Sequence, residues 1–519
     1  MNTAEFLGIA SAIAPDKPAM VFEGKRLTYG QVMERVNRMA NALAGLGVAK
    51  GDRVAILQVN CPEYVEAYFA TTKLGAIFVP LNFRSKQDEL SYMIANSESK
   101  ACFAGARYFD LVDAMRPALA SVKHFISIEG KRKGMLFYDD LLAKSSPDDV
   151  VTDIQDEDLT ILMYTAGTTG VPKGVPLTHN MFSVYVLGNV NPADPDTVES
   201  NLLTVPLYHV AGAQAMMAAI YGGRTLVMMR QFEVDGWLEL ATKERVDRAM
   251  LVPTMLKRVI DHPNFGKYDL SNMKVITYGA APMPFEVIKK AIEVMPWVRF
   301  INAFGQTETA STITMLGPED HVIEGTPAEK EKKLKRLASS IGRPMDDVEV
   351  AILGESGRPL PPGQVGEIVA RGPRVMSGYW KEPEKTKQAF TKDGWLLTGD
   401  LGYMDEERYI YLTGRAKDII IRGGENIASE EVEGVLMQHP AVDEAAVIGV
   451  PDDQWGEAVR AVVVMKDGHK VTPEELSEFC RQRLSSFKKP GSVVFVEELP
   501  RNPMGKVLKR VLREQYGKP

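Results

Sequence analysis

The 519-residue chain has little cysteine, no long apolar run and no excess of positive charge. Its three cysteines, Cys61, Cys102 and Cys480, lie far apart without CxxC spacing, which argues against a disulfide framework or a cysteine zinc site. We therefore expect a reducing, cytoplasmic environment. No apolar stretch approaches the roughly 20 residues that span a bilayer, and no basic residue precedes the apolar N-terminal run. We expect neither an integral membrane segment nor a secretory signal.

The charge balance is mildly acidic, with 61 Lys plus Arg against 68 Asp plus Glu and a formal net charge of −7. That balance disfavours a broad nucleic-acid surface but still allows a local anion site. Apolar residues make up 45% of the chain, which is ordinary for a globular protein and disfavours long disorder. We expect a monomer or homodimer of about three domain-sized units, at roughly 150 residues each.

Short apolar runs alternate with amphipathic segments through most of the chain. Thr28 and Gln31 have capping-box spacing, and apolar residues at helical intervals follow them as far as Gly47. Buried strands are predicted at 53–57, 159–163, 202–205, 250–252, 274–277 and 299–301. Strands that alternate with helices predict βαβ units, largely parallel sheets and thus an α/β fold.

The pattern changes after about Asp346, where predicted strands are separated by Gly and Pro turns. This change predicts a β-rich subdomain at about 346–413, within a large N-terminal lobe of residues 1–413. The remaining residues, 414–519, have their own strands and helices, including a helix capped by Thr472. They predict a small α+β C-terminal lobe that can move as a unit.

A segment rich in glycine and threonine, residues 164–175 (YTAGTTGVPKGV), lies between a predicted strand and the helix predicted after His179. The backbone N–H groups and hydroxyls of such a loop can point at phosphate oxygens, and its lysine adds a point charge. The spacing differs from the P-loop pattern GxxxxGK[ST], and neither GxGxxG nor HExxH occurs in the chain. The segment predicts a polyphosphate site.

This segment resembles the phosphate loop of the adenylate-forming (AMP-binding) enzymes, which include acyl-CoA synthetases, peptide-synthetase adenylation domains and luciferases. Further stretches resemble the same family in the same order: GAAPM at 279–283, NAFGQTET at 302–309, GEI at 366–368, WLLTGD at 395–400, GRAKD at 414–418 and PRNPMGK at 500–506. Several motifs in order are more specific than any one of them. The resemblance implies a large α/β lobe and a small lobe that rotates about a hinge.

The resemblance also implies an ATP site. The residues that it assigns to ATP are Thr165, Gly167, Thr168, Thr169, Gly170, Lys173, Gly279, Ala280, Ala281, Asn302, Ala303, Phe304, Gly305, Thr307, Asp400, Arg415 and Lys506. Thr307 would bond the α-phosphate, and Glu308 would ligate Mg²⁺, a hard cation suited to carboxylate and phosphate oxygens. Asp400, assisted by Arg415, would accept hydrogen bonds from the ribose hydroxyls.

The resemblance implies a two-step ligation. A carboxylate attacks the α-phosphorus of MgATP to give acyl-AMP and pyrophosphate, and a thiol then displaces AMP in a reaction that can also run in reverse. The lysine that matches Lys506 bridges the carboxylate and the α-phosphate in the family, where negative charge gathers. Lys417 matches the hinge, and Gly423 and Gly424 would leave space for the pantetheine arm of CoA. Thr307, Glu308, His209 and Lys506 are the predicted catalytic residues.

The segment from Pro206 to Gly212 resembles the wall of the family's acyl pocket, with His209 at its mouth. The predicted lining is His209, Val210, Ala211, Gly212, Ala215 and Gly305, and a plain core helix is the alternative for the small apolar residues. Between Pro206 and Ala219 there is no Asp for a substrate ammonium and no Arg for a second carboxylate. We expect a hydrophobic monocarboxylic acid, either fatty, alicyclic or aromatic. CoA is the expected acceptor, and a free-standing acyl carrier protein is the alternative acceptor. The alternative to an enzyme is a non-catalytic nucleotide-binding relative.

Overall fold

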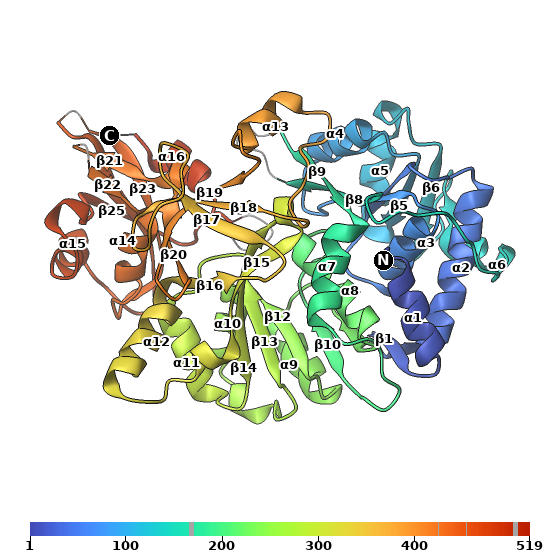
Figure 1. The fold of residues 1–519 in the computed structure, drawn as a ribbon, viewed down its shortest axis with the longest axis horizontal. Helices are drawn as coiled ribbons and strands as arrows, with labels where there is room; N and C mark the ends of the chain where they lie inside the picture. Colours follow the sequence, from blue (N-terminus) through green and yellow to red (C-terminus); the bar gives the residue numbers. More distant parts are fainter. Residues whose placement is uncertain (166–170, 424, 453, 502–506, 519) are drawn as a thin grey trace.

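The computed structural model describes residues 1–165, 171–423, 425–452, 454–501 and 507–518. The site residues Gly167, Thr168, Thr169, Gly170, Gly424 and Lys506 lie outside the described residues. Within the described ranges the strands form three sheets. Two of them build a broad body, and the third lies to one side in the red and orange C-terminal part of the ribbon (Figure 1).

One sheet is parallel except at its last pair and carries the N-terminal half of the body. In spatial order its strands are β7 (Leu136–Phe137), β6 (His124–Ile128), β5 (Ala101–Gly105), β3 (Arg53–Leu57), β4 (Ile77–Pro80), β8 (Leu159–Thr165) and β9 (Lys173–Thr178). The helices of this half are α1 (Glu5–Ile13), α2 (Tyr29–Gly45), α3 (Pro62–Lys73), α4 (Gln87–Ser97), α5 (Phe109–Met115) and α6 (Tyr138–Lys144). The predicted capping box at Thr28 and Gln31 is confirmed.

The second sheet runs through the rest of the body. Its order is β17 (Glu349–Leu353), β18 (Gly366–Arg371), β19 (Leu396–Met404), β20 (Ile410–Arg415), β16 (Ser340–Pro344), β15 (Ser311–Leu316), β14 (Arg299–Gln306), β13 (Val275–Gly279), β12 (Arg248–Leu251), β10 (Ser200–Leu203), β11 (Thr225–Met228), β1 (Pro18–Phe22) and β2 (Lys25–Thr28). Strands β10 to β14 pair in parallel, whereas β14 to β20 pair antiparallel. The predicted change near Asp346 thus falls within the antiparallel part of one continuous sheet.

The helices of this part pack into two apolar cores, one of which includes the fully buried Trp237. They are α7 (His179–Asn189), α8 (Val210–Tyr221), α9 (Val234–Lys243), α10 (Pro253–Ile260), α11 (Phe285–Val294), α12 (Pro327–Ser339) and α13 (Pro383–Ala389). No helix among the described residues is both long and apolar enough to cross a membrane. The predicted α/β fold is confirmed.

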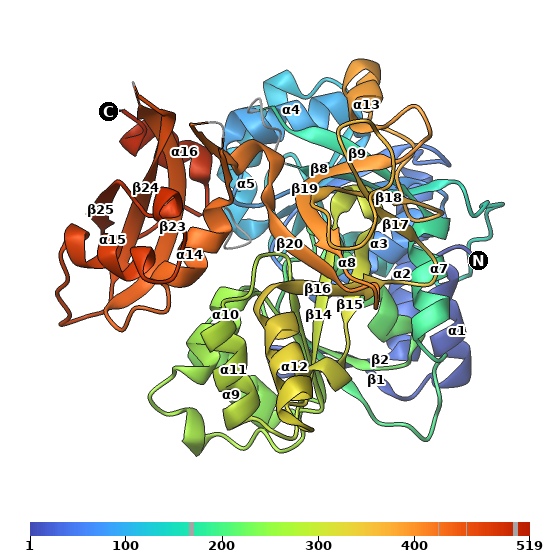
Figure 2. The ribbon, with the colours of Figure 1, turned by 60° about the vertical axis from the view of Figure 1, so that its left-hand side comes forward.

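The C-terminal part has a separate sheet and its own apolar core. Strands β21 (Ile420–Arg422), β22 (Glu425–Ile427), β23 (Val442–Asp452), β24 (Gly456–Met465) and β25 (Ser492–Val496) form the sheet, and helices α14 (Ser429–Leu436), α15 (Pro473–Arg481) and α16 (Lys509–Tyr516) accompany it. Figure 2 shows this small lobe standing beside the body. Strand β20 ends at Arg415, and the chain passes into the small lobe through a 3₁₀ turn, Ala416–Asp418.

One local prediction is wrong. We expected the segment 164–175 to join a strand to a helix, but β8 and β9 are antiparallel neighbours in which Thr165 pairs with Lys173. Strand β9 escaped prediction because Pro176 interrupts it. Since β9 is the edge strand of its sheet, a proline is tolerated there.

Candidate active site

Lys173 stands at the first residue of β9, opposite Thr165 at the last residue of β8. The hairpin pairing therefore holds both residues at the mouth of the predicted phosphate loop. The Lys173 Nζ atom lies 4.2 Å from the centroid of the Tyr379 ring. A cation over an aromatic face is attracted by the ring quadrupole, so Tyr379 holds this ammonium group in place.

Glu308 lies in a 3₁₀ turn, Thr307–Thr309, which directly follows β14. The Tyr379 hydroxyl donates a hydrogen bond to Glu308 Oε1 at 2.9 Å, and the backbone N–H of Met376 donates to the Glu308 carbonyl at 2.9 Å. Burial, together with the Glu308 carboxylate, raises the pKa of Tyr379 far above its usual value. The hydroxyl is consequently a permanent donor at neutral pH, and Tyr379 touches both Lys173 and Glu308.

The strands β13 and β14 bring the two predicted adenine and phosphate motifs together, because Gly279 pairs with Ala303. A Cβ at Gly279 would stand 2.1 Å from the Ala303 carbonyl oxygen, and one at Gly305 would stand 1.6 Å from that of Ser311. Both glycines are therefore required by close backbone packing, whatever they bind. Ala280 has a φ of +66°, which is strained for a residue with a side chain.

The predicted ribose-binding residues come together at the end of the large sheet. Asp400 and Arg415 are register partners on β19 and β20, and Arg415 Nε lies 2.8 Å from Asp400 Oδ1. Asp400 is almost fully buried. A buried carboxylate that is oriented by a guanidinium is well prepared to accept hydrogen bonds from a diol.

His209 forms the N-terminal boundary of α8, where its ring lies 4.4 Å from that of Tyr208. Burial lowers the pKa of His209 to about 3, so the imidazole is neutral at physiological pH. Its Nε2 atom has no hydrogen-bond partner among the described residues. A buried, unsatisfied nitrogen is uncommon in folded proteins, which is consistent with a role toward a ligand.

The other predicted acyl-pocket residues fall into two groups. Val210 packs into the apolar core, and a Cβ at Gly212 would stand 2.3 Å from the Pro206 carbonyl oxygen, so both have structural roles. Ala211 and Ala215 are partly exposed and lie four residues apart on one side of α8. These two alanines retain the features expected of a pocket wall, and the lining stays a prediction.

The hinge region is tied to the last helix of the small lobe. Asp418, next to the predicted hinge residue Lys417, pairs with Arg513 of α16 at 2.7 Å. Lys509, also on α16, pairs with Glu433 at 2.8 Å and donates a hydrogen bond to Ser429 Oγ at 2.6 Å. The helix that follows the PRNPMGK motif is thereby fixed to α14 and to the residue beside the hinge.

Gly423 lies beneath the ring of Trp455, at the predicted passage for pantetheine. It has a φ of +60°, and a Cβ there would stand 2.7 Å from the ring. The Trp455 side chain is large yet 45% exposed, and the Arg422 guanidinium lies 5.8 Å from its ring centroid. An exposed aromatic face beside a cation is suited to a base and its phosphates.

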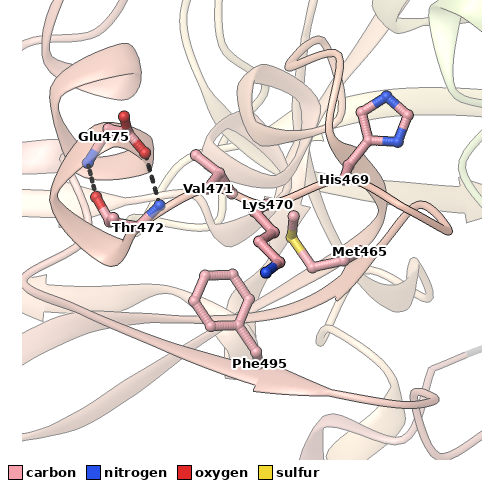
Figure 3. A pocket seen from close by; sticks show the side chains of 7 residues that line it. All are labelled: Met465, His469, Lys470, Val471, Thr472, Glu475 and Phe495. Atoms are coloured by element: carbon pink, nitrogen blue, oxygen red, sulfur yellow. Dashed lines mark hydrogen bonds between the residues drawn. The ribbon is translucent and has the colours of Figure 1, made fainter.

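An open pocket of about 450 Å³ lies elsewhere on the small lobe. Figure 3 shows Met465, Lys470 and Phe495 around it, next to the capping hydrogen bonds between Thr472 and Glu475. None of the predicted site residues lines this pocket. It therefore gives no support to the predicted site.

The described residues contain no group of three His, Cys, Asp or Glu side chains that could hold a metal ion. A divalent cation at Glu308 would therefore take most of its ligands from elsewhere. Mg²⁺ commonly binds through one or two carboxylates, substrate phosphates and water. A single carboxylate beside Lys173 thus fits a magnesium ion that arrives with a nucleotide.

The two-lobed fold and the charged groups at the ends of β9, β14 and β20 are typical of the adenylate-forming class. The chain belongs to the AMP-binding enzyme family, whose match covers residues 10–380, and residues 431–506 match the C-terminal domain of AMP-binding enzymes. The predicted family is confirmed.

Full-length relatives are named as ligases. The feruloyl-CoA synthase of Amycolatopsis sp is 36% identical over 97% of both chains. A fatty acid–[acyl-carrier-protein] ligase of Streptomyces coeruleorubidus is 34% identical over 97% of this chain and 94% of its own. The structure of a Mycobacterium tuberculosis fatty acyl CoA synthetase is 33% identical, with a TM-score of 0.76 and coverage of 100% and 99%. The predicted activity, an AMP-forming acid–thiol ligase, is confirmed at the level of its class.

Sequence reasoning missed Tyr379, the residue between Lys173 and Glu308. The stretch from Arg371 to Trp380 (RGPRVMSGYW) contains a Gly-Tyr step, but nothing in its local pattern points to phosphate chemistry. Only the fold shows that this loop reaches two distant motifs.

Proposed function

We propose that this chain is an ATP-dependent acyl-CoA synthetase that activates a hydrophobic monocarboxylic acid as acyl-AMP and passes the acyl group to CoA. The observation that carries the proposal is the arrangement of Lys173, Tyr379 and Glu308 in a chain whose full-length relatives are acid–thiol ligases. A cation on the face of one ring and a carboxylate at the hydroxyl of the same residue suit a polyphosphate and its metal.

The protein's part in the first step is positioning and charge stabilisation, because the attacking carboxylate is already nucleophilic and pyrophosphate is the leaving group. Lys173 would bind the β- and γ-phosphates and Thr307 the α-phosphate. Lys506 would neutralise the charge that develops between the carboxylate and the α-phosphorus. Bound Mg²⁺ supplies positive charge to the phosphate oxygens.

The proposed acid is fatty, alicyclic or aromatic. Residues 206–219 offer no carboxylate for a substrate ammonium and no guanidinium for a second acid group. His209 is partly buried and neutral, so it adds no charge to this region. The partly exposed Ala211 and Ala215 support a pocket wall of small residues.

The proposed acceptor is CoA. The stacking of Trp455 over Gly423, with Arg422 beside the ring, supports a site for a nucleotide-bearing thiol. An acyl carrier protein is the second candidate, because one full-length relative is named for that acceptor. The three cysteines are free and buried, which supports a reducing cytoplasmic setting. We propose that the enzyme works there as a monomer or homodimer.

The test is acid-dependent exchange of radiolabelled pyrophosphate into ATP, over a panel of fatty, alicyclic and aromatic acids. AMP release is then measured with CoA, with a carrier protein and with neither. We expect exchange with at least one hydrophobic acid and AMP turnover that requires CoA. Exchange with no acid contradicts the ligase proposal, and turnover with the carrier protein alone contradicts the proposed acceptor.

A further inference from the structure

Residues 376–380 cross two motifs that lie far apart in the sequence. At one end, the Met376 N–H donates to the Glu308 carbonyl at 2.9 Å and the Tyr379 hydroxyl donates to Glu308 Oε1 at 2.9 Å. At the other end, the Trp380 N–H donates to the carbonyl of Gly174 at 2.8 Å. This short segment therefore connects the turn that carries Glu308 to the strand that begins at Lys173.

The segment that carries Tyr379 is fixed by contacts that do not involve Glu308 or Lys173. The Tyr379 N–H donates to Thr386 Oγ1 at 2.9 Å. Gly378 has a φ of +154°, and a Cβ there would stand 2.5 Å from the Thr386 side chain. The indole N–H of Trp380 donates to the Asn96 carbonyl at 3.2 Å. The backbone that carries Tyr379 is thus held in place independently of the two charged residues that its side chain contacts.

Tyr379 contacts the two charged residues through different parts of its side chain. Lys173 contacts its ring and Glu308 contacts its hydroxyl, and within the described residues no ion pair joins Lys173 to Glu308. A lysine and a glutamate free to approach would attract each other more strongly than either is attracted to a neutral phenol. A direct pair would neutralise the two groups that a metal–polyphosphate complex needs.

We propose that Tyr379 is a positioning residue of the MgATP site, which holds the Glu308 carboxylate through its hydroxyl and keeps Lys173 apart from it through its ring. The inference rests on the proposed function, because it assumes that Glu308 faces the metal and Lys173 the phosphates. The two parts of the proposal can be tested separately, because the hydroxyl would hold Glu308 and the ring would keep Lys173 apart from it.

Two substitutions separate these parts. Tyr379→Phe keeps the ring and removes the hydrogen bond to Glu308, whereas Tyr379→Leu removes both. Tyr411→Phe is the matched control, because the Tyr411 hydroxyl also donates to a carboxylate, Asp405 Oδ2 at 3.1 Å, away from the site. Calorimetric titration with ATP at a series of Mg²⁺ concentrations gives nucleotide affinity and its metal dependence without turnover.

We expect Tyr379→Phe to raise the Mg²⁺ concentration for half-maximal ATP binding about 10-fold, the usual size of one hydrogen bond to a charged group. Binding at saturating Mg²⁺ should stay close to that of the wild type. Tyr379→Leu should further weaken ATP binding at saturating Mg²⁺ by about 10-fold, because Lys173 then pairs with Glu308. Tyr411→Phe should match the wild type throughout.

The same substitutions in a Glu308→Gln variant test whether the effect of Tyr379→Phe on metal dependence acts through Glu308. There Tyr379→Phe should no longer change the metal dependence, whereas a general structural defect would persist. A Tyr379→Phe titration identical to that of Tyr411→Phe overturns the proposal. Failure of the wild-type chain to bind MgATP or to exchange pyrophosphate would instead overturn the proposed function.

Discussion

The two lobes hold their predicted reactive lysines in different ways. Lys173 of the large lobe stands at the end of a paired strand and against the Tyr379 ring. In the small lobe, α16, the helix that follows the PRNPMGK motif, is fixed to other residues of that lobe through Lys509 and Arg513. Under the proposed function, the large lobe would contain the polyphosphate site, and rotation of the small lobe would decide whether Lys506 acts on it.

A charged contact joins the two lobes within the part of the chain that the structure describes. Lys257 of α10 pairs with Asp443 of β23 at 2.9 Å, and both side chains are about one-third exposed. Helix α14 packs near β20 close to the point where the chain leaves the large sheet. If the proposed roles hold, nucleotide binding and acyl transfer depend on different parts of the molecule and can be damaged separately.

The largest expected effect comes from removing the small lobe's lysine. Lys506→Ala should slow acyl-AMP formation by about 100- to 1,000-fold, the usual loss for a group that stabilises transition-state charge. Thioester formation from supplied acyl-AMP should be nearly unchanged. Pyrophosphate exchange and thioester release measure the two steps, with Lys470→Ala as an exposed-lysine control. Equal loss in both steps would contradict the division between the lobes.

A substitution at the hinge should damage the other step. Lys417→Pro fixes one backbone dihedral, so a lobe that must rotate between steps cannot reach its second arrangement. We expect thioester formation to fall by about 100-fold with acyl-AMP formation within a few-fold of the wild type. Lys417→Ala is the control, since it removes the charge and keeps the dihedral free. Similar results for both variants would show that the side chain matters and not the hinge.

Acid should weaken the large lobe first. Burial lowers the pKa of His209 to about 3 and those of His179 and His321 to about 4, and all three lie in the large lobe. Because unfolded histidines titrate near 6.5, the unfolded chain binds more protons below that pH, and stability is complete above about 6.5 and falls as the pH drops toward 4. Each histidine should cost about 2 kcal/mol by pH 5.

Peptide-resolved hydrogen exchange at pH 7.5 and pH 5 measures this difference between the lobes. After correction for the intrinsic exchange rate at each pH, amide protection should fall in the large lobe and change little in the small lobe, where His439 is only partly buried. His321→Gln should lower stability at pH 7.5, because it disturbs the contact with the Tyr278 hydroxyl at 2.9 Å, and should weaken the pH dependence. Uniform acid sensitivity of both lobes would refute the assignment.

The smallest effect belongs to the charged contact between the lobes. Partly exposed ion pairs contribute about 1 kcal/mol or less, so Lys257→Met should change the ratio of the two half-reaction rates by no more than about 5-fold. Lys290→Met is the control, because Lys290 pairs with Asp261 inside the large lobe. Single-turnover rates of both half-reactions check the ratio. A change of equal size in Lys290→Met would show that the change in the rate ratio does not depend on the contact between the lobes.

The sequence predicted the features that depend on the order of residues along the chain. The alternation of apolar runs with capped helices predicted the α/β body, and the ordered motifs predicted the family. The pairing of Asp400 with Arg415 agrees with the grouping of their motifs, although their ligand roles stay predictions.

Long-range contacts were not predictable in the same way. Strand β9 was missed because Pro176 argues against a strand. The proline is tolerated because β9 lies at the edge of its sheet, and that position cannot be predicted from the segment alone. Tyr379 was missed because its partners are residues 173 and 308, which only the folded chain brings to it. Likewise, Gly305 was read as part of a ligand site, while the carbonyl of Ser311 gives it a separate packing requirement.

The ion pair between Asp400 and Arg415 has a mechanical consequence. Arg415 is the last residue of β20, and the turn that leads out of the large lobe begins at the next residue. A nucleotide whose ribose binds Asp400 would therefore act, through Arg415, on the turn about which the small lobe would rotate. Release of AMP would remove that interaction, so the empty site would itself leave the small lobe ready for a new cycle.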